Sequence, residues 1–423
     1  MENMNNKQSS TENDCSPQDG GSQKTTSSDK ETGERSVSIP WGVYFTAYFI
    51  QGILMQLLLG NISVFLRKAL NLDWLVLTTS FFIMAVPVVL RPLFAFIADK
   101  WPAKLSSLFV FGLLMVTAGT MVAGFGTLSN IGGLGFIVAG FSVGIVGATI
   151  LNVVADSHIV RFISLDKSAK VNSSRRIFAF LGVFVAQLGY ILIVGKNLGD
   201  LRAWGLYFML PTISVAISFI IISFKEKSPQ LLPTAQDLPT PPAQWLINNP
   251  PQNKTQHPRW LPIIFLFLIL LLFNLPDGLI EAPWEIFIVE KYGTEAWVTY
   301  SGLIIFGGFV AGAGFILARR SGKRPPEWDF LWFAPIITAY YALLLFIPPF
   351  EVLMGITICL QSVVGFIQVR ILQAMQGHSY FRRAGLTFQI FMITYQGGKF
   401  LGIGLSGVAM TYSGYLGLFL ALW

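Results

Sequence analysis

The sequence predicts an all-α integral membrane protein whose helices cross the bilayer in two sets. The chain of 423 residues is 53% hydrophobic and only 12% charged, whereas soluble domains are about 25% charged. Its mean hydropathy is +0.60. Many apolar runs also reach the roughly 20 residues that an α-helix needs to cross the hydrocarbon. These observations exclude an ordinary soluble domain.

Residues 1–38 are polar and rich in Ser, Thr, Asn, Gln and Gly. A segment of this composition cannot bury a core, so we predict a disordered tail. It lacks the basic segment followed by an apolar segment that defines a signal peptide. The first membrane helix can serve for insertion instead.

Apolar runs of membrane-spanning length predict the helices in order. The first set covers roughly 41–64, 74–97, 105–126, 131–156, 176–196 and 203–224. A Pro-rich polar linker is expected at 225–259. The second set covers roughly 260–288, 296–317, 329–348, 351–375 and 385–408. We therefore expect an N-terminal six-helix bundle over 39–224 and a C-terminal bundle over 260–423.

Similar stretches recur in the two halves in the same order, which indicates a duplicated bundle. Asp99 aligns with Arg319, an offset of 319 − 99 = 220, and the same offset aligns His158 with His378. It also places Trp41 one residue from Trp260. A further match, GLYFML at 205–210 with GLFLAL at 417–422, predicts a twelfth helix that is truncated. We interpret the sequence as a fragment or as one with a misplaced end.

Lys and Arg are concentrated in alternate loops, which predicts a cytoplasmic N-terminus and linker by the positive-inside rule. The net charge of +7 is explained by these loops, so no nucleic-acid partner is expected. We expect a multi-pass protein of the plasma (inner) membrane.

Two cysteines and three histidines, all far apart, cannot build a disulfide framework or a convincing metal cluster. No nucleophile–base pair or phosphate-binding loop is visible, and GGFVAGAG at 307–314 indicates close helix packing. We expect no cofactor and no enzymatic activity.

The stretch from Ala95 to Lys104, AFIADKWPAK, follows the second predicted helix. This stretch, with six helices on each side of a linker, resembles the major facilitator superfamily, whose signature here is Gly-x-x-x-Asp-Arg/Lys-x-Gly-x-Arg/Lys. Asp99, Lys100 and Lys104 fit, whereas Ala95 and Pro102 replace the two glycines. The resemblance implies a 6+6 transmembrane helix bundle.

Three further stretches resemble one branch of that superfamily. RPLFAFIADKWP is similar to the folate–biopterin transporters, LPDGLIEAPWEIFIVEKYGTEAW to the muropeptide permeases, and NVVADSHIVRF to both groups and to the bacteriochlorophyll-assembly PucC-type proteins.

A layer of charged residues lies near the expected cytoplasmic ends of the helices. The resemblance implies that Asp99 takes the role of a latch that holds this face closed, with Arg161 or Arg370 as partners. Alternatively, the residues simply lie at the headgroup level. The gating layer comprises Arg91, Asp99, Lys100, Lys104, Asp156, Arg161 and Arg370.

A deeper layer holds Asp277 and Lys399. At ~1.5 Å per residue these lie roughly 25 Å and 21 Å along helices that start on the same side, so an ion pair between them is expected. Asp277, Glu281 and Glu285 share one helix face, and Pro276 and Gly278 loosen the helix beside them. Glu285 is expected at the outer interface.

We assign Asp277, Glu281 and Lys399 to proton coupling or substrate binding, because a carboxylate beside a cavity can carry a proton and release it when that face opens. The alternative is that the Asp277–Lys399 pair only ties two helices together.

Helices one, four, seven and ten line the central cavity of the superfamily, as the resemblance implies. The candidate substrate contacts on them are Gln51, Gln56, Gln361 and Gln368. Hydrogen bonding between helices is the alternative role for each of these side chains.

Together these observations predict a secondary active transporter that works by alternating access. Its expected partners are the lipid bilayer, a coupling proton or other cation, and a small polar or amphipathic organic solute, such as a zwitterion or an organic anion. The alternative is an assembly or scaffold protein of the PucC type that transports nothing.

Overall fold

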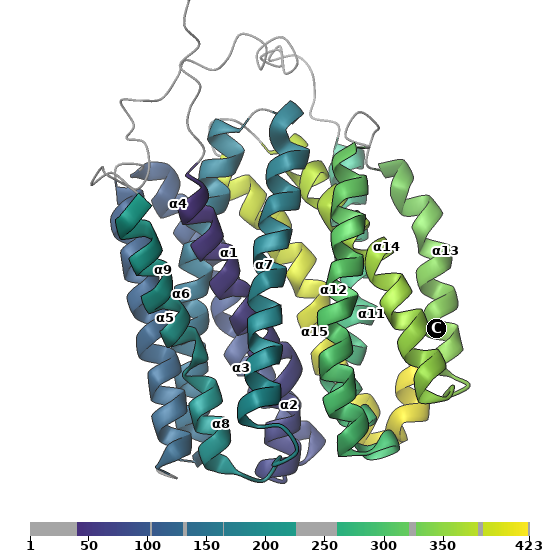
Figure 1. The fold of residues 1–423 in the computed structure, drawn as a ribbon. Helices are drawn as coiled ribbons and strands as arrows, with labels where there is room; N and C mark the ends of the chain where they lie inside the picture. The colour runs from purple at the N-terminus through teal and green to yellow at the C-terminus, as the bar shows by residue number, and fades with distance from the viewer. Residues whose placement is uncertain are drawn as a thin grey trace, which may run out of the picture. The chain divides into compact units, whose positions relative to one another are not determined.

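The structure is a computed structural model that describes residues 40–101, 104–129, 133–163, 165–225, 260–320, 327–379 and 384–421. In these ranges every regular element is helical (Figure 1). The predicted tail at 1–38 and nearly all of the predicted linker, 226–259, lie outside the described residues, as do residues 422–423.

The first half of the chain contains the first six predicted spans, several of them interrupted. Two prolines, Pro87 and Pro92, accompany the 3₁₀ segment in the second span, because each lacks the N–H that an α-helix needs. The first span widens into two π-helical stretches, a rare geometry. The elements are α1 Trp41–Met55, η1 Gln56–Asn61, α2 Ile62–Val64, η2 Phe65–Ala69, α3 Trp74–Ala85, η3 Val86–Leu90, α4 Arg91–Lys100, α5 Leu105–Leu128, α6 Gly133–Phe162, α7 Leu165–Ile193, α8 Leu201–Phe208 and α9 Leu210–Lys225.

The second half continues with longer helices. Gly293, at φ 92°, adopts a left-handed conformation that separates α11 from α12. Gly414, with φ 61° and ψ −161°, breaks α15, so this element contains the eleventh predicted span and the start of the next. The elements are α11 Trp260–Tyr292, α12 Thr294–Arg320, α13 Glu327–Leu344, α14 Phe350–Gly377 and α15 Ala384–Ala421.

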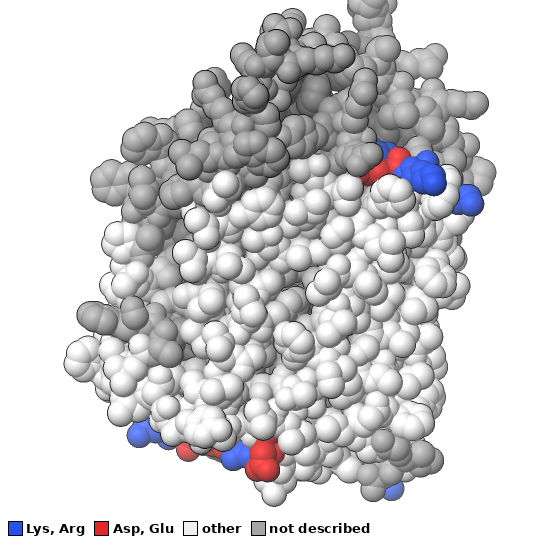
Figure 2. Space-filling model, turned by 180° about the vertical axis from the view of Figure 1, so that it is seen from behind, with Lys and Arg blue, Asp and Glu red and all other residues white. Residues whose placement is uncertain are grey.

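Ten helical stretches in the described residues are long and apolar enough to cross a membrane, and α13 contributes a shorter apolar segment, Pro335–Leu344. On the face shown in Figure 2, the described Lys, Arg, Asp and Glu gather at two opposite ends, with a broad uncharged band between them. This distribution fits a chain that crosses the hydrocarbon many times.

Glycines create equivalent close contacts in the two halves. A Cβ on Gly52 would overlap the carbonyl of Ala179, and a Cβ on Gly278 would overlap the carbonyl of Lys399. The offsets are 278 − 52 = 226 between α1 and α11 and 399 − 179 = 220 between α7 and α15. The Gly52–Gly278 match is therefore shifted by seven residues relative to the match of Trp41 with Trp260 (226 − 219), because α11 has seven more residues before its glycine.

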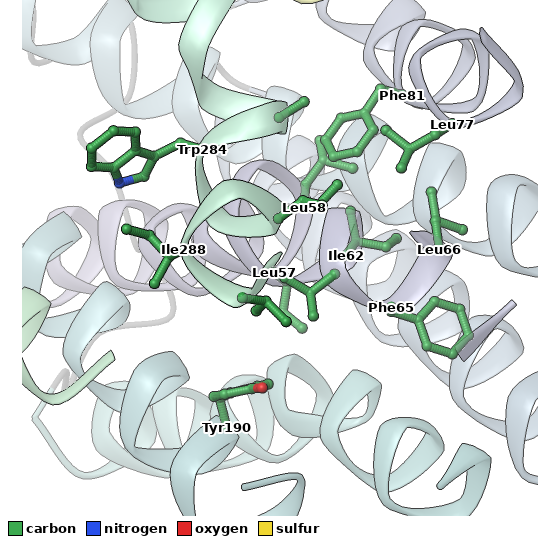
Figure 3. Packing of buried hydrophobic residues seen from close by; sticks show 14 of the residues in the cluster. Leu57, Leu58, Ile62, Phe65, Leu66, Leu77, Phe81, Tyr190, Trp284 and Ile288 are labelled. Carbon is green, nitrogen blue, oxygen red and sulfur yellow. The ribbon is translucent and has the colours of Figure 1, made fainter. Parts of the chain in front are cut away.

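The two halves meet along two seams. Helix α15 packs against α3, α4 and α6, and α7 packs against α12 and α14. At one end, which we call the Asp99 end, polar side chains join the halves. At the opposite end, which we call the Trp297 end, a large apolar cluster contains side chains of helix 1 (α1 to η2, Trp41–Ala69), α7, α8 and α11 (Figure 3). There the indole N–H of Trp297 donates to the hydroxyl of Tyr190 at 2.5 Å.

The close approach of α11 and α15 predicts a specific sensitivity to one methyl group. A Cβ on Gly402 would lie 2.6 Å from the backbone nitrogen of Leu279, whereas a Cβ on Gly404 would meet nothing within 4 Å. We expect Gly402→Ala to lower the free energy of unfolding by about 1–3 kcal/mol through overpacking. Gly404→Ala, two residues away, should change it by less than about 0.5 kcal/mol. Thermal unfolding in detergent measures both, and equal midpoints would contradict the packing described.

Candidate functional site

A cavity of about 430 Å³ lies between the two halves and is lined by helix 1, α7, α11, α12, α13, α14 and Lys399 of α15. Such a volume is typical of small-molecule sites, which run to roughly 300–1,000 Å³. All four of the glutamines singled out from the sequence line it: Gln51, Gln56, Gln361 and Gln368. Their role as substrate contacts remains a prediction.

Lys399 lies between two carboxylates at the cavity wall. Its ammonium is 3.0 Å from Oδ2 of Asp277 and 2.8 Å from Oε2 of Glu281. The ion pair expected between Asp277 and Lys399 is therefore present, and Glu281 joins it. The Asp277 side chain is 48% exposed and that of Lys399 only 17%, so Asp277 is the member most open to the cavity.

This triad, Asp277, Glu281 and Lys399, is positioned by the packing of α11 on α15. The two acids are four residues apart and share a helix face. Gly278, next to Asp277, lets the backbone of Lys399 approach α11 closely. The lysine side chain then reaches both acids. With all three groups ionised the triad carries one excess negative charge, so it can take up one proton or one further cation.

Glu285 corrects the expectation from sequence. We expected a solvated acid at the outer interface, but the residue is 5% exposed and lines the cavity wall. Its Oε2 atom has no hydrogen-bond partner among the described residues. The physical reason is that α11 continues to Tyr292, two turns beyond Glu285, and those turns pack against helix 1.

Arg176 is a cavity residue that the sequence reasoning missed. It lines the main cavity and an adjoining chamber of about 110 Å³, which also contains Arg175, Asp277 and Lys399. The sequence placed Arg176 at the membrane entry, but α7 begins at Leu165, so the residue lies well inside the helix. The polar, helix-compatible segment before Ile177 was the signal that could have extended the predicted helix.

The two neighbouring arginines differ in their partners. Arg175 forms an ion pair with Asp156 at 2.9 Å and lies over the ring of Tyr48 at 4.6 Å. The Nε atom of Arg176 is buried without a hydrogen-bond partner, and Tyr395 contacts its side chain. Among the described residues no carboxylate forms an ion pair with Arg176.

At the Asp99 end, an ion pair within the first half also reaches the second half. Asp99 binds Arg161 at 2.5 Å, one of the two partners that the resemblance implied, and accepts a hydrogen bond from the backbone N–H of Leu386 at 3.0 Å. Because Leu386 belongs to α15, this carboxylate joins α4 and α6 to the other half.

Asp156 and Arg91 form a second link across the same seam through Gln389 of α15. The amide of Gln389 donates to Asp156 at 2.9 Å and accepts from Arg91 at 3.3 Å. Asp156 also accepts from the hydroxyl of Tyr48 at 2.6 Å. These groups are buried, so each depends on the others for its hydrogen bonds.

The remaining predicted gating residues lie apart from these links. Arg370, the alternative partner for Asp99, pairs instead with Asp329 of α13 at 2.6 Å. Lys100 and Lys104 are exposed, and both ammonium groups lie over the ring of Trp101, at 5.0 Å and 5.5 Å.

The triad predicts an asymmetric response to mutation. Lys399→Met leaves two carboxylates without their cation, so we expect the free energy of unfolding to fall by about 1–3 kcal/mol. Glu281→Gln removes one of the two carboxylates that repel each other, so we expect it to lower the free energy of unfolding by less than Lys399→Met does. Adding Asp277→Asn to Lys399→Met should restore part of the loss, which thermal unfolding of the double variant measures. Strictly additive effects would show that the three groups are not coupled.

The observed class is a multi-pass helical membrane protein with a charged cavity between two halves. The sequence profile of the Major Facilitator Superfamily matches residues 45–403. The chain therefore belongs to this superfamily of membrane transporters, whose members are not enzymes. A search of curated proteins finds no match.

Solved structures show the same fold at low sequence identity. A transporter of this superfamily, FucP, in the outward conformation, aligns with 12% identity and a TM-score of 0.60, over 92% of this chain and 97% of that one. A second structure, of the E. coli fucose:proton symporter FucP, aligns with 13% identity and a TM-score of 0.57, over 92% and 96%. The human organic anion transporter MFSD10 (TETRAN) aligns with 12% identity and a TM-score of 0.61, over 92% and 96%.

Proposed function

We propose that this protein is a proton-coupled secondary active transporter that moves a small organic solute with an anionic group by alternating access. The observation that carries the proposal is the triad at the wall of a cavity between two halves. Charged residues within a membrane are costly, and they usually mark substrate or ion pathways.

Proton coupling is assigned to Asp277 and Glu281. Two carboxylates one turn apart repel each other when both are ionised, and Lys399 offsets that repulsion only in part. Protonation of one acid leaves a balanced pair between the other acid and Lys399. The proton content of the triad therefore sets the charge that a solute meets in the cavity.

Solute recognition is assigned to Arg176 together with the cavity glutamines. The guanidinium of Arg176 has a buried Nε and no carboxylate partner in the described part of the chain, which favours an anion, because charge-assisted hydrogen bonds to carboxylate or phosphate are the strong ones. The carboxylates on the opposite wall can accept hydrogen bonds from hydroxyl or ammonium groups. An organic anion or a zwitterion can bind both to Arg176 and to the carboxylates.

Alternating access is assigned to the two seams. One state would break the polar links at the Asp99 end, and the other would break the aromatic contacts at the Trp297 end. We further propose that the Asp99 end faces the cytoplasm of a plasma membrane, and that the chain lies in the folate–biopterin, muropeptide and PucC-like branch of the superfamily.

Uptake by proteoliposomes tests the proposal. The protein is supplied with a mixed metabolite pool, with and without an imposed pH gradient, and accumulated solutes are identified by mass spectrometry. We expect gradient-driven accumulation in the wild type and its loss in Asp277→Asn, because the variant cannot exchange a proton at that position. Asp73→Asn, an exposed carboxylate at the start of α3, is the matched control and should transport normally.

Each result is decisive. Equal accumulation by wild type and Asp277→Asn would leave transport standing and make Asp277 structural. Absence of any accumulation by folded protein would favour the alternative, a PucC-type assembly protein.

Arg176 gives a prediction about the solute itself. Replacing it with Gln removes a charge-assisted hydrogen bond of about 1.5–3 kcal/mol. We expect the apparent affinity for the accumulated solute to fall by roughly 10- to 150-fold, and Arg176→Lys to restore part of it. Concentration-dependent uptake measures the change. An accumulated solute that is neutral or purely cationic would contradict the assignment of Arg176.

A further inference from the structure

Glu285 is a buried acid that the triad does not use. It lies one turn beyond Glu281 on α11, at the cavity wall toward the Trp297 end, and is 5% exposed. Lys399, which pairs with Asp277 and Glu281, forms no ion pair with Glu285 among the described residues. The Oε2 atom has no hydrogen-bond partner among the described residues.

The carboxyl group sits in a notch on helix 1. A Cβ on Gly60 would overlap the side-chain amide of Gln56 and would lie 2.7 Å from Oε1 of Glu285, so the absence of a side chain at Gly60 makes room for both groups. Gly60 belongs to the π-helical stretch Gln56–Asn61, and Gln56 lines the same part of the cavity. The contact therefore joins α11 of the second half to helix 1 of the first.

The groups that face Glu285 supply no positive charge within the described ranges. On its own helix the nearest charged group is Glu281. Tyr190 of α7, Tyr207 of α8 and Tyr300 of α12 lie within electrostatic range of it. Their hydroxyl oxygens accept hydrogen bonds from Trp297, Asn61 and Trp284 respectively, and none of the three hydroxyls donates to Oε2 of Glu285 within the described residues.

Toward the Trp297 end, two cations of η2 are engaged with another acid of α11. Lys68 lies 3.0 Å and Arg67 3.9 Å from Glu290, one turn and a residue beyond Glu285. An ionised Glu285 would thus be a buried charge with an unsatisfied oxygen and without a cation among the described residues, which is strongly unfavourable. The neutral acid avoids most of that cost.

The space against Gly60 that holds the Glu285 carboxyl lies within the apolar cluster that closes the Trp297 end. Trp284 and Ile288, on either side of Glu285 in α11, belong to the same cluster as Leu57 and Tyr190 (Figure 3). If Glu285 became charged inside this cluster, separation of α11 from helix 1 would admit water, and the water would solvate the charge. Proton loss and opening are therefore linked.

We propose that Glu285 is a second proton-binding site, separate from the triad, and that its neutral acid seated against Gly60 keeps the Trp297 end of the cavity closed. The proposal rests on the transport function proposed above and adds to it the group that ties the proton to one gate. Deprotonation expels the carboxylate from the notch and opens that end.

Infrared difference spectroscopy tests the protonation state without any solute. We expect the carbonyl band of a protonated carboxylic acid in the wild type at neutral pH, lost in Glu285→Gln and retained in Glu290→Gln. Glu290 is the matched control, because it is an acid of the same helix that is 31% exposed and paired with Lys68. A spectrum unchanged in Glu285→Gln overturns the proposal.

Distance measurements between spin labels test the gate. Cysteines replace Asn197 and Thr294, which are exposed at the Trp297 ends of the two halves, in a background with Cys15 and Cys359 replaced by Ser. In the wild type, the fraction of molecules with a long distance between the two labels should grow as the pH rises. Because one proton is released, the ratio of long to short distances should change by at most about tenfold per pH unit. The distance in Glu285→Gln should stay short at every pH, and Asp73→Asn, which removes an exposed acid, should follow the wild type.

Gly60→Ala keeps Glu285 but adds a methyl group in the space beside its carboxyl group. We expect its long-distance population to appear at lower pH than in the wild type. A pH profile of Glu285→Gln identical to the wild type, or no pH response in the wild type, overturns the proposal. Neither measurement involves transport. A protein that passes both tests but transports nothing would therefore refute only the transport function and leave the role of Glu285 standing.

Discussion

The charge balance around Lys399 constrains much of the second half. One ammonium serves two carboxylates in a setting where an unpaired charge is expensive, so its position is tightly restricted. The glycines of α11 and α15 meet this restriction by bringing the two backbones into contact beside the triad. A bulkier interface would move the lysine away from both acids, and the cavity would then contain two uncompensated charges.

The two ends of the molecule are closed by different chemistry. Asp99, Asp156 and Gln389 join the halves at one end through buried hydrogen bonds, and Ser168 and Asn172 add contacts to Gln376 there. Water can replace such bonds when a seam opens, so their net contribution is modest. The opposite end has exposed ion pairs, Lys68 with Glu290 and Lys196 with Glu295, but it mainly buries aromatic and aliphatic surface, which water does not replace. Its opening requires an additional source of free energy, such as a charge formed within it.

The sequence predicted the fold well, because membrane spans are long apolar runs and their number and order are visible without contacts. It also predicted the pairing of Asp277 with Lys399, since depth along a helix follows from residue count. It placed Glu285 and Arg176 wrongly for one reason: polar residues at the ends of a run were assigned to the interface, although α7 and α11 continue well past their apolar segments. Arg370 was misassigned because its partner, Asp329, lies on another helix of the same half, which spacing alone does not reveal.

The repeated glycine contacts have a mechanical consequence. Equivalent packing holds α1 against α7 in one half and α11 against α15 in the other, but Ala179 occupies the position that corresponds to Lys399. An alanine stands at this contact in the first copy, whereas the second copy has the lysine of the triad there. All three charged groups of the triad lie on the two helices that this contact holds together, so the alternating access proposed above would move them as one unit. Their mutual distances would then stay constant while solvent access to them alternates.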